Sequence, residues 1–174
     1  AGPWVGELAS SALSTATAVS ALALLLRHGN VETEQRERIE ELIAGGLNWL
    51  IPRQNADGGW GDTDLSFSNI ATTMLAQAAI RLTAFPLEDS CTQRAAAYVE
   101  AQGGVKGLHR RYGRDKTFAA PILANCALAG MVPWSEVAAL PFEMACMPQR
   151  FYRMARLPVV SYAIPALVAI GQAK

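Results

Sequence analysis

Apolar residues recur at helical spacing through most of the chain. Residues 11–27 are rich in Ala and Leu and contain no Gly or Pro, which predicts a mostly buried helix. Residues 33–51 begin with Glu-rich turns and then carry apolar residues three and four positions apart, which predicts an amphipathic helix. Further helices are expected at 70–82, 90–102 and 117–128. Because convincing strand-like alternation is absent from the sequence, the pattern predicts an all-α fold built of helical hairpins.

Polar and turn-forming residues mark the ends of these predicted helices. Asn69 is placed to cap the helix at 70–82, because an Asn side chain can accept a hydrogen bond from a free N–H of the first turn. Gly29 and Asn30 end the first helix. Pro121 falls early in the helix at 117–128, where a missing N–H is tolerated.

A Gly-rich turn followed by a helix of small residues occurs more than once. The sequence STATAVSALAL begins ten residues after Trp4, and NIATTMLAQAA begins nine residues after Trp60, so the copies are offset by about 55 residues. A weaker third copy begins at Gln102 and leads to TFAAPILANCALAG. Repeats of this length are typical of stacked helical hairpins. The first copy lacks a helix ahead of its turn, which suggests that the sequence begins inside a repeat.

Composition favours a globular chain without nucleic-acid binding. Hydrophobic residues make up 51% of the chain, which supports a sizeable core. The 15 basic and 15 acidic residues cancel, so there is no basic surplus of the kind that nucleic acid usually requires. The three cysteines, Cys91, Cys126 and Cys146, lie far apart, and Cys126 and Cys146 stand in apolar runs that predict buried thiols. An odd count argues against a disulfide framework, and a reducing compartment is expected.

The segment at 45–60, GGLNWLIPRQNADGGW, resembles the QW repeat of the squalene–hopene cyclase and oxidosqualene cyclase family. The matching positions are Gly46, Trp49, Leu50, Ile51, Gln54, Gly58 and Trp60. A Gln amide can bond free backbone groups at helix ends, and a Trp can stack over that amide and clamp the following turn. These residues are therefore expected to act as a structural repeat clamp.

The resemblance extends over essentially the whole chain, in the order of the N-terminal third of a bacterial squalene–hopene cyclase. It continues through 95–104 and 131–160. The matching positions in 131–160 are Pro133, Trp134, Pro141, Glu143, Ala155, Arg156, Val159 and Val160. It implies a partial (α/α) barrel of the terpenoid cyclase kind. Residues 1–130 would form the QW-repeat region, and residues 131–174 would be a Pro-interrupted apolar segment of the same domain.

The resemblance also implies an activity whose acid is missing from this sequence. Members of the family cyclise a linear polyprene such as squalene by protonating an alkene, without a cofactor, through the middle Asp of a DxDD motif. No DxDD occurs here, and the nearest string runs from Asp62 to Leu65. Asp62 and Asp64 could still form a proton-donor pair, but an Asp-rich loop after a Gly-Gly-Trp turn more often caps helices. A non-catalytic helical region of a cyclase is therefore expected. The alternative is a stand-alone α/α module that binds a prenyl lipid or a protein.

Other candidate groups have simpler interpretations. The four tryptophans could line a carbocation pocket, but Trp49 and Trp60 are better explained as repeat clamps, with Trp4 as an earlier copy and Trp134 packing a turn. His28 and His109 are isolated, so no metal site is expected. A basic cluster with Tyr112 is expected to be a solvated loop, with anionic lipid or an acidic partner as the alternative. Its members are Lys106, His109, Arg110, Arg111, Arg114 and Lys116.

The C-terminal segment combines regularly spaced arginines with an apolar run. Arg150, Arg153 and Arg156 would be neighbours on a helix, and residues 157–171 contain no charge. A buried core helix and a monotopic membrane contact with a substrate entrance remain equally open. The residues expected in such a contact are Arg150, Phe151, Tyr152, Arg153, Arg156, Val159, Val160 and Tyr162. The resemblance implies a peripheral location on the cytoplasmic side of a membrane, with a homodimer as a further expectation.

Overall fold

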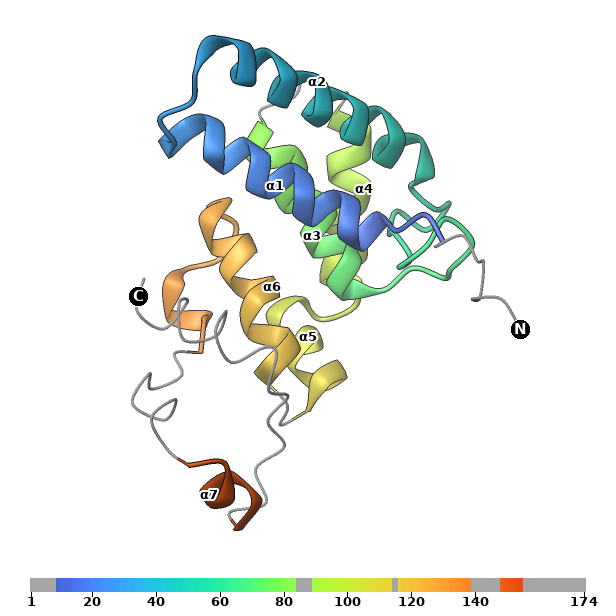
Figure 1. Cartoon of the computed structure of the whole chain (residues 1–174). Helices are drawn as coiled ribbons and strands as arrows, with labels where there is room; N and C mark the ends of the chain where they lie inside the picture. Colours follow the sequence, from blue (N-terminus) through green and yellow to red (C-terminus); the bar gives the residue numbers. More distant parts are fainter. Residues whose placement is uncertain (1–8, 84–88, 114–115, 139–147, 155–174) are drawn as a thin grey trace, which may run out of the picture. The chain divides into compact units, whose positions relative to one another are not determined.

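The computed structural model describes residues 9–83, 89–113, 116–138 and 148–154 (Figure 1). Within these ranges the chain is helical and forms no strand, only isolated bridges, which confirms the predicted all-α fold. The elements are α1 (Ala12–His28), α2 (Thr33–Leu50), η1 (Ile51–Arg53), α3 (Ile70–Thr83), α4 (Asp89–Ala101), α5 (Gly104–Tyr112), α6 (Lys116–Leu128), η2 (Trp134–Glu136) and α7 (Gln149–Met154). The chain divides into two compact units, Ala1–Val99 and Glu100–Lys174, which are described separately. The division at residues 130 and 131 stays a prediction.

Side-chain caps set the starts of α1 and α3 in the first unit. The Ser14 N–H donates to Ser11 Oγ at 3.1 Å at the start of α1. The Thr72 N–H donates to Asn69 Oδ1 at 3.0 Å at the start of α3, which confirms Asn69 as the cap of that helix. Each cap satisfies one of the N–H groups that a helix leaves without a partner in its first turn.

The core of the first unit lies where α1 and α3 pack against each other, with α2 packed on α1. Helix α1 buries small residues along one face, and α3 is buried along nearly its whole length. On α2, a Cβ added at Gly46 would lie 2.6 Å from Cγ2 of Val19, so the glycine allows α1 and α2 to approach closely. Small residues on these helices thus permit short interhelical distances.

Helices α1 and α3 begin with the same arrangement of hydrogen bonds. Thr15 Oγ1 donates to the Ser11 carbonyl at 2.8 Å, and Thr73 Oγ1 donates to the Asn69 carbonyl at 2.8 Å. Asn69 follows Ser11 by 58 residues, close to the expected offset of about 55. The repeat itself stays a prediction.

In the second unit, α5 packs on α6, and η2 also packs on α6. Helix α5 corrects the expectation of a solvated loop at the basic cluster. It begins after Gly103, whose φ is 90°, and buries Gly107 and Leu108. Glycines at 104 and 107 weaken its intrinsic helix propensity, so burial of Leu108 against neighbouring residues must stabilise it.

Candidate functional site

The loop between η1 and α3, residues 54–69, joins several helices of the first unit; we call it the Gln–Trp loop. Backbone bridges link Trp60 to Asn69 and Thr63 to Ser11. The Asn69 N–H donates to the Trp60 carbonyl at 2.9 Å, and the Ala12 N–H donates to the Asp62 carbonyl at 3.1 Å. The loop therefore lies across the first residues of both α1 and α3.

Trp60 connects the end of α2 to the start of α3. Its side chain is completely buried. The indole Nε1–H donates to the Leu50 carbonyl at 2.9 Å, at the last residue of α2. The backbone N–H of Trp60 donates to Thr73 Oγ1 at 3.0 Å, in the first turn of α3. Trp60 thus combines a large apolar contact area with an indole hydrogen bond.

Gln54 connects the same loop to α4. Its Nε2 donates to the Gly58 carbonyl and to the Cys91 carbonyl, both at 2.9 Å, and Cys91 lies in the first turn of α4. Its Oε1 accepts a hydrogen bond from the guanidinium of Arg94. Both ends of the amide are therefore used, which fixes its orientation.

Gly58 is the position where the loop passes closest to α4. Its φ is 88°, in the left-handed region that residues with a side chain avoid. A Cβ at this position would lie 2.5 Å from the Arg94 carbonyl oxygen. Both the backbone conformation and the close approach therefore require glycine.

The structure brings Gln54, Gly58 and Trp60 into one network and places Gly46 and Trp49 on α2. Trp49 is partly exposed, and the Arg53 guanidinium lies 4.2 Å from the centre of its ring. Arg53 Nη1 also donates to the Trp49 carbonyl at 2.8 Å. Gly46 faces α1, as described above. Trp49 is thus a cation–π partner of Arg53.

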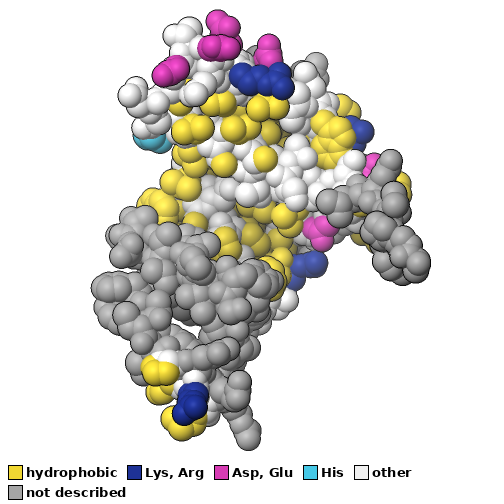
Figure 2. All heavy atoms as spheres, in the orientation of Figure 1, with side chains coloured by type: hydrophobic (Ala, Val, Ile, Leu, Met, Phe, Trp, Pro, Cys, Tyr) yellow, Lys and Arg dark blue, Asp and Glu magenta, His cyan; other side chains and the backbone are white. Residues whose placement is uncertain are grey.

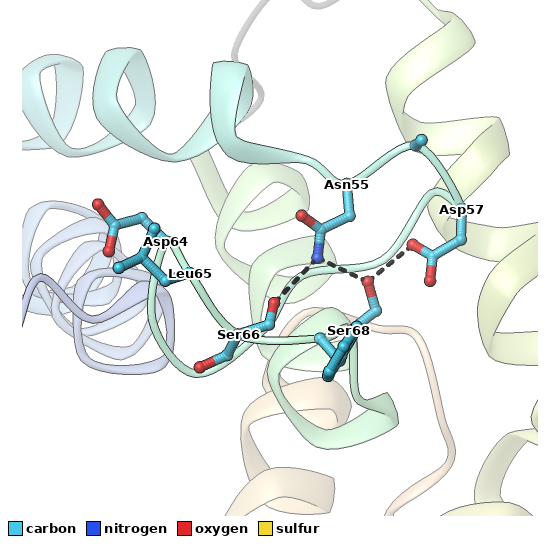
Figure 3. Close-up of a pocket in the computed structure, with 8 residues that line it drawn as sticks. Asn55, Asp57, Asp64, Leu65, Ser66 and Ser68 are labelled. Atoms are coloured by element: carbon cyan, nitrogen blue, oxygen red, sulfur yellow. Dashed lines mark hydrogen bonds between the residues drawn. The ribbon is translucent and has the colours of Figure 1, made fainter.

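Asp62 and Asp64 have different surroundings. Asp62 Oδ1 accepts from Asn69 Nδ2 at 2.8 Å and from Thr72 Oγ1 at 2.5 Å, so this carboxylate lies beside the residues that begin α3. Asp64 lines a surface hollow, and Figure 3 shows its carboxylate pointing away from Asn55 and Asp57. Both residues are exposed. Alkene protonation calls for an acid in an apolar surrounding shielded from water, and neither carboxyl has one.

The hollow beside the loop has a volume of about 400 Å³ and is lined by polar residues that bond one another (Figure 3). Asn55 Nδ2 donates to Ser68 Oγ at 2.9 Å, and Ser68 Oγ donates to Asp57 Oδ1 at 2.7 Å. Leu65 and Phe67, also in its lining, are 94% and 96% exposed. This network was not predicted from the sequence, where its only signal is the alternation of Ser with apolar residues at 65–68.

The family of the chain follows from comparison with known proteins. The model of the squalene-hopene cyclase N-terminal domain matches residues 1–164. The chain belongs to this family. The resemblance to the squalene–hopene cyclase family is therefore confirmed.

Three curated relatives of this chain are much longer than the chain itself. The squalene hopane cyclase of Aspergillus fumigatus is 27% identical over 156 residues, covering 87% of this chain and 19% of the relative. The match to the enfumafungin synthase of Hormonema carpetanum is 29% identical and covers 84% of this chain and 10% of the relative. The match to a terpene cyclase–glycosyl transferase fusion protein of Humicola fuscoatra is 29% identical and covers 85% of this chain and 10% of the relative. The chain thus spans less than a fifth of each relative. No solved structure gives a significant match.

Two of the three cysteines lie in the described part of the chain. Cys91 and Cys126 are buried thiols, which confirms the prediction for Cys126, whereas Cys146 lies outside the described residues. Burial raises the pKa of Cys126 to about 12. Burial also raises the pKa of Cys91, against a smaller opposing effect of Arg94. Both thiols are therefore protonated at neutral pH and poor nucleophiles. The described residues contain no group of three or more His, Cys, Asp or Glu side chains that could hold a metal ion.

Only part of the expected membrane contact of this family member is described. Helix α7 carries exposed Arg150, Phe151 and Met154, and Figure 2 shows basic and hydrophobic side chains together on this helix. Tyr152 and Arg153 belong to α7, but their side chains are not described. Arg156, Val159, Val160 and Tyr162 lie outside the described residues, as does Trp4. In the described part of the chain, no helix combines the length and apolar character needed to cross a bilayer.

Proposed function

We propose that this chain is the N-terminal, non-catalytic helical region of a triterpene cyclase of the squalene–hopene type. The family match over residues 1–164 supports the cyclase assignment, as do relatives named as a squalene hopane cyclase and a terpene cyclase fusion. The sequence has no DxDD string, and the carboxylate of Asp62 is engaged by Asn69 and Thr72. The acid that protonates the substrate would therefore come from another part of the complete protein.

The observation that carries this proposal is the set of helix ends joined by the Gln–Trp loop. Trp60 bonds the end of α2 and the start of α3, Gln54 bonds the start of α4, and Asp62 bonds the start of α1. A cyclisation through carbocations requires a cavity whose walls keep a fixed shape, and such walls depend on well-supported helices. The role of this loop would be to hold the helices that surround such a cavity.

The substrate of the complete enzyme would be a linear polyprene such as squalene. Such a hydrocarbon partitions into a lipid bilayer, because its transfer from water to an apolar phase is strongly favourable. We accordingly place the protein at a membrane surface on the cytoplasmic side, with α7 and residues 156–162 as a contact. Exposed Phe151, and Met154 at 77% exposure beside Arg150, support this part of the proposal.

Product analysis tests the proposed function. The 174-residue chain and the complete protein encoded by its gene would each be incubated with squalene, and the extracts analysed by gas chromatography and mass spectrometry. Cyclic triterpenes are expected with the complete protein and not with the chain. Cyclic product from the chain alone would contradict the non-catalytic role. A folded complete protein without product would contradict the cyclase assignment and leave a binding module as the alternative.

The contact at α7 has its own test in a vesicle flotation assay of the chain. Replacing Arg150 and Arg153 by Glu should reduce flotation, because the substituted side chains would be repelled by anionic headgroups and hydrated more strongly. Replacing Arg36 and Arg38 of α2 by Glu gives a control with the same change of charge. Equal flotation of the α7 variant and the unmodified chain would remove α7 from the contact.

A further inference from the structure

The zero net charge of the chain conceals a strong separation of charge between its two units. Residues 1–99 contain 6 Lys and Arg against 11 Asp and Glu, whereas residues 100–174 contain 9 against 4. The first unit is thus acidic and the second basic, each by five charges. In Figure 2, acidic side chains gather over α2 of the first unit. An asymmetry of this kind suggests that the basic part contacts an anionic surface.

Helix α5 carries a concentrated part of the basic charge of the second unit. Lys106, Arg110 and Arg111 are all exposed, and the helix contains no acidic residue. Leu108 is completely buried, and α5 packs on α6. The helix therefore holds its cations on a face that is fixed by packing of the opposite side.

Stabilisation of the helix accounts for only part of the basic charge of α5, because Arg110 and Arg111 belong to its last turn, where the helix dipole favours a positive charge. Among the described residues, ion pairs join Arg36 to Glu40 and Arg38 to Glu41, both within α2, and none involves α5. Lys106 lies in the first turn of α5, where the helix dipole disfavours a positive charge. A Cβ at Gly103 would lie 2.7 Å from Arg110 Nη2, so this guanidinium also lies near that end. A role outside the folded unit accounts better for Lys106 and for the position of the Arg110 guanidinium.

Aromatic side chains lie next to this basic helix. Tyr112, the last residue of α5, stacks on Phe118 of α6 with ring centroids 5.7 Å apart. Phe118 is 48% exposed. Basic side chains beside a partly exposed aromatic ring suit the boundary between lipid headgroups and acyl chains. This combination favours a bilayer surface over a purely polar anionic partner.

We propose that the exposed basic face of α5, formed by Lys106, Arg110 and Arg111, binds the anionic headgroups of a phospholipid bilayer. The choice of a bilayer rests on the proposed function, because a hydrocarbon substrate would be taken from one. The site differs from the α7 contact in its residues. It combines exposed cations with the partly exposed Phe118 of the neighbouring helix, whereas α7 carries exposed apolar side chains itself.

The expected loss of vesicle binding follows from the number of cations removed from α5. Each Lys or Arg close to an anionic bilayer strengthens binding roughly fivefold, so the loss of all three should weaken it roughly a hundredfold. The attraction should also be screened by salt, since the screening length falls from about 10 Å at 0.1 M to about 3 Å at 1 M. Neutral phosphatidylcholine vesicles should bind the unmodified chain and the variant equally.

The experiment is co-sedimentation of the chain with vesicles, with and without phosphatidylglycerol, at about 0.1 M salt. The test variant is Lys106→Gln, Arg110→Gln, Arg111→Gln. The matched control is Arg36→Gln, Arg38→Gln, Arg81→Gln, which removes the same charge from exposed positions of the first unit. We expect the test variant to bind vesicles with phosphatidylglycerol more weakly than the unmodified chain does. The control variant should bind both kinds of vesicle as the unmodified chain does. A variant with Arg110→Lys and Arg111→Lys keeps the charge and should bind as the unmodified chain does.

Several results would overturn the assignment of α5. Equal weakening by the test and control triples would show a general charge effect, and unchanged binding of the test triple would exclude α5. Loss of binding by the charge-preserving variant, with an unchanged circular dichroism spectrum, would contradict binding through charge. Tighter binding to a DNA duplex than to the vesicles at the same salt would favour nucleic acid. Because the vesicles contain no polyprene and the readout is binding, these results are independent of whether the complete protein cyclises squalene.

Discussion

Replacing Trp60 by Phe tests whether the Gln–Trp loop holds its helices through this side chain. The substitution removes the Nε1–H that donates to the Leu50 carbonyl at 2.9 Å, and it shortens a completely buried ring. The hydrogen bond contributes about 1–2 kcal/mol when its loss leaves a buried group less well satisfied. The missing ring atoms leave a cavity in the core, which lowers the free energy of unfolding by about 1–2 kcal/mol.

These contributions place the expected loss for Trp60→Phe at about 3 kcal/mol in the free energy of unfolding. For a chain of this size, about 3 °C of melting temperature is lost per kcal/mol, so a decrease of about 10 °C is expected. Trp49→Phe is the matched control, because it makes the same chemical change at a partly exposed position. The phenyl ring can still contact the Arg53 guanidinium, so a loss of only about 0.5 kcal/mol is expected.

Urea and thermal unfolding of the 174-residue chain, followed by circular dichroism, would measure both variants. Circular dichroism is preferred to tryptophan fluorescence because each substitution removes one of the four tryptophans that give the fluorescence signal. Equal stability of the Trp60→Phe and Trp49→Phe variants would refute the special role of Trp60. A large loss for Trp49→Phe with none for Trp60→Phe would reverse the assignment.

The remaining predictions concern the same unfolding measurements. Gly58→Ala should lower the free energy of unfolding by about 2–3 kcal/mol, because φ is 88° and the new Cβ would lie 2.5 Å from a carbonyl oxygen of α4. Gly45→Ala on α2, where a Cβ meets open space, should raise the free energy of unfolding by about 0.5–1 kcal/mol. Asp62→Ala should cost about 1 kcal/mol and Asp64→Ala less than about 0.5 kcal/mol, because only the former holds the start of α3; equal losses would contradict this difference. Since burial raises the pKa of Cys126 from 9.0 to about 12, the folded state keeps a proton that the unfolded state loses, and stability should fall above pH 9 by up to about 1.4 kcal/mol per pH unit. Cys126→Ala should remove that part of the slope, and an unchanged slope would argue against the buried thiol as its cause.

Helices formed by long periodic segments could be predicted from the sequence. The segments at 11–27 and 70–82 contain enough Ala and Leu for helix propensity and burial to agree, and the structure has helices there within one residue. Helix α5 was missed because its glycines lower helix propensity. Its stability depends on burial of Leu108, which the sequence does not reveal.

The hydrogen-bond partners of the Gln–Trp loop could not be predicted, because they lie far away in sequence. Gln54 was identified from the QW pattern, but its contact with Cys91 spans 37 residues. Asp62 was expected in a loop that starts the next helix, yet its backbone also bonds Ala12 of α1. Which residues meet across a junction depends on how helices pack, and local sequence carries little information about that packing.

The non-catalytic role of this region is tested most directly by the turnover of squalene by the complete protein with Asp62→Asn and Asp64→Asn together. These substitutions keep the shape of both side chains and remove their capacity to act as acids. Measured well below the melting temperature, the rate should stay within about twofold of the unmodified protein, with the same products. A loss of a hundredfold or more, the scale expected for removal of a general acid, with an unchanged melting temperature would contradict that role.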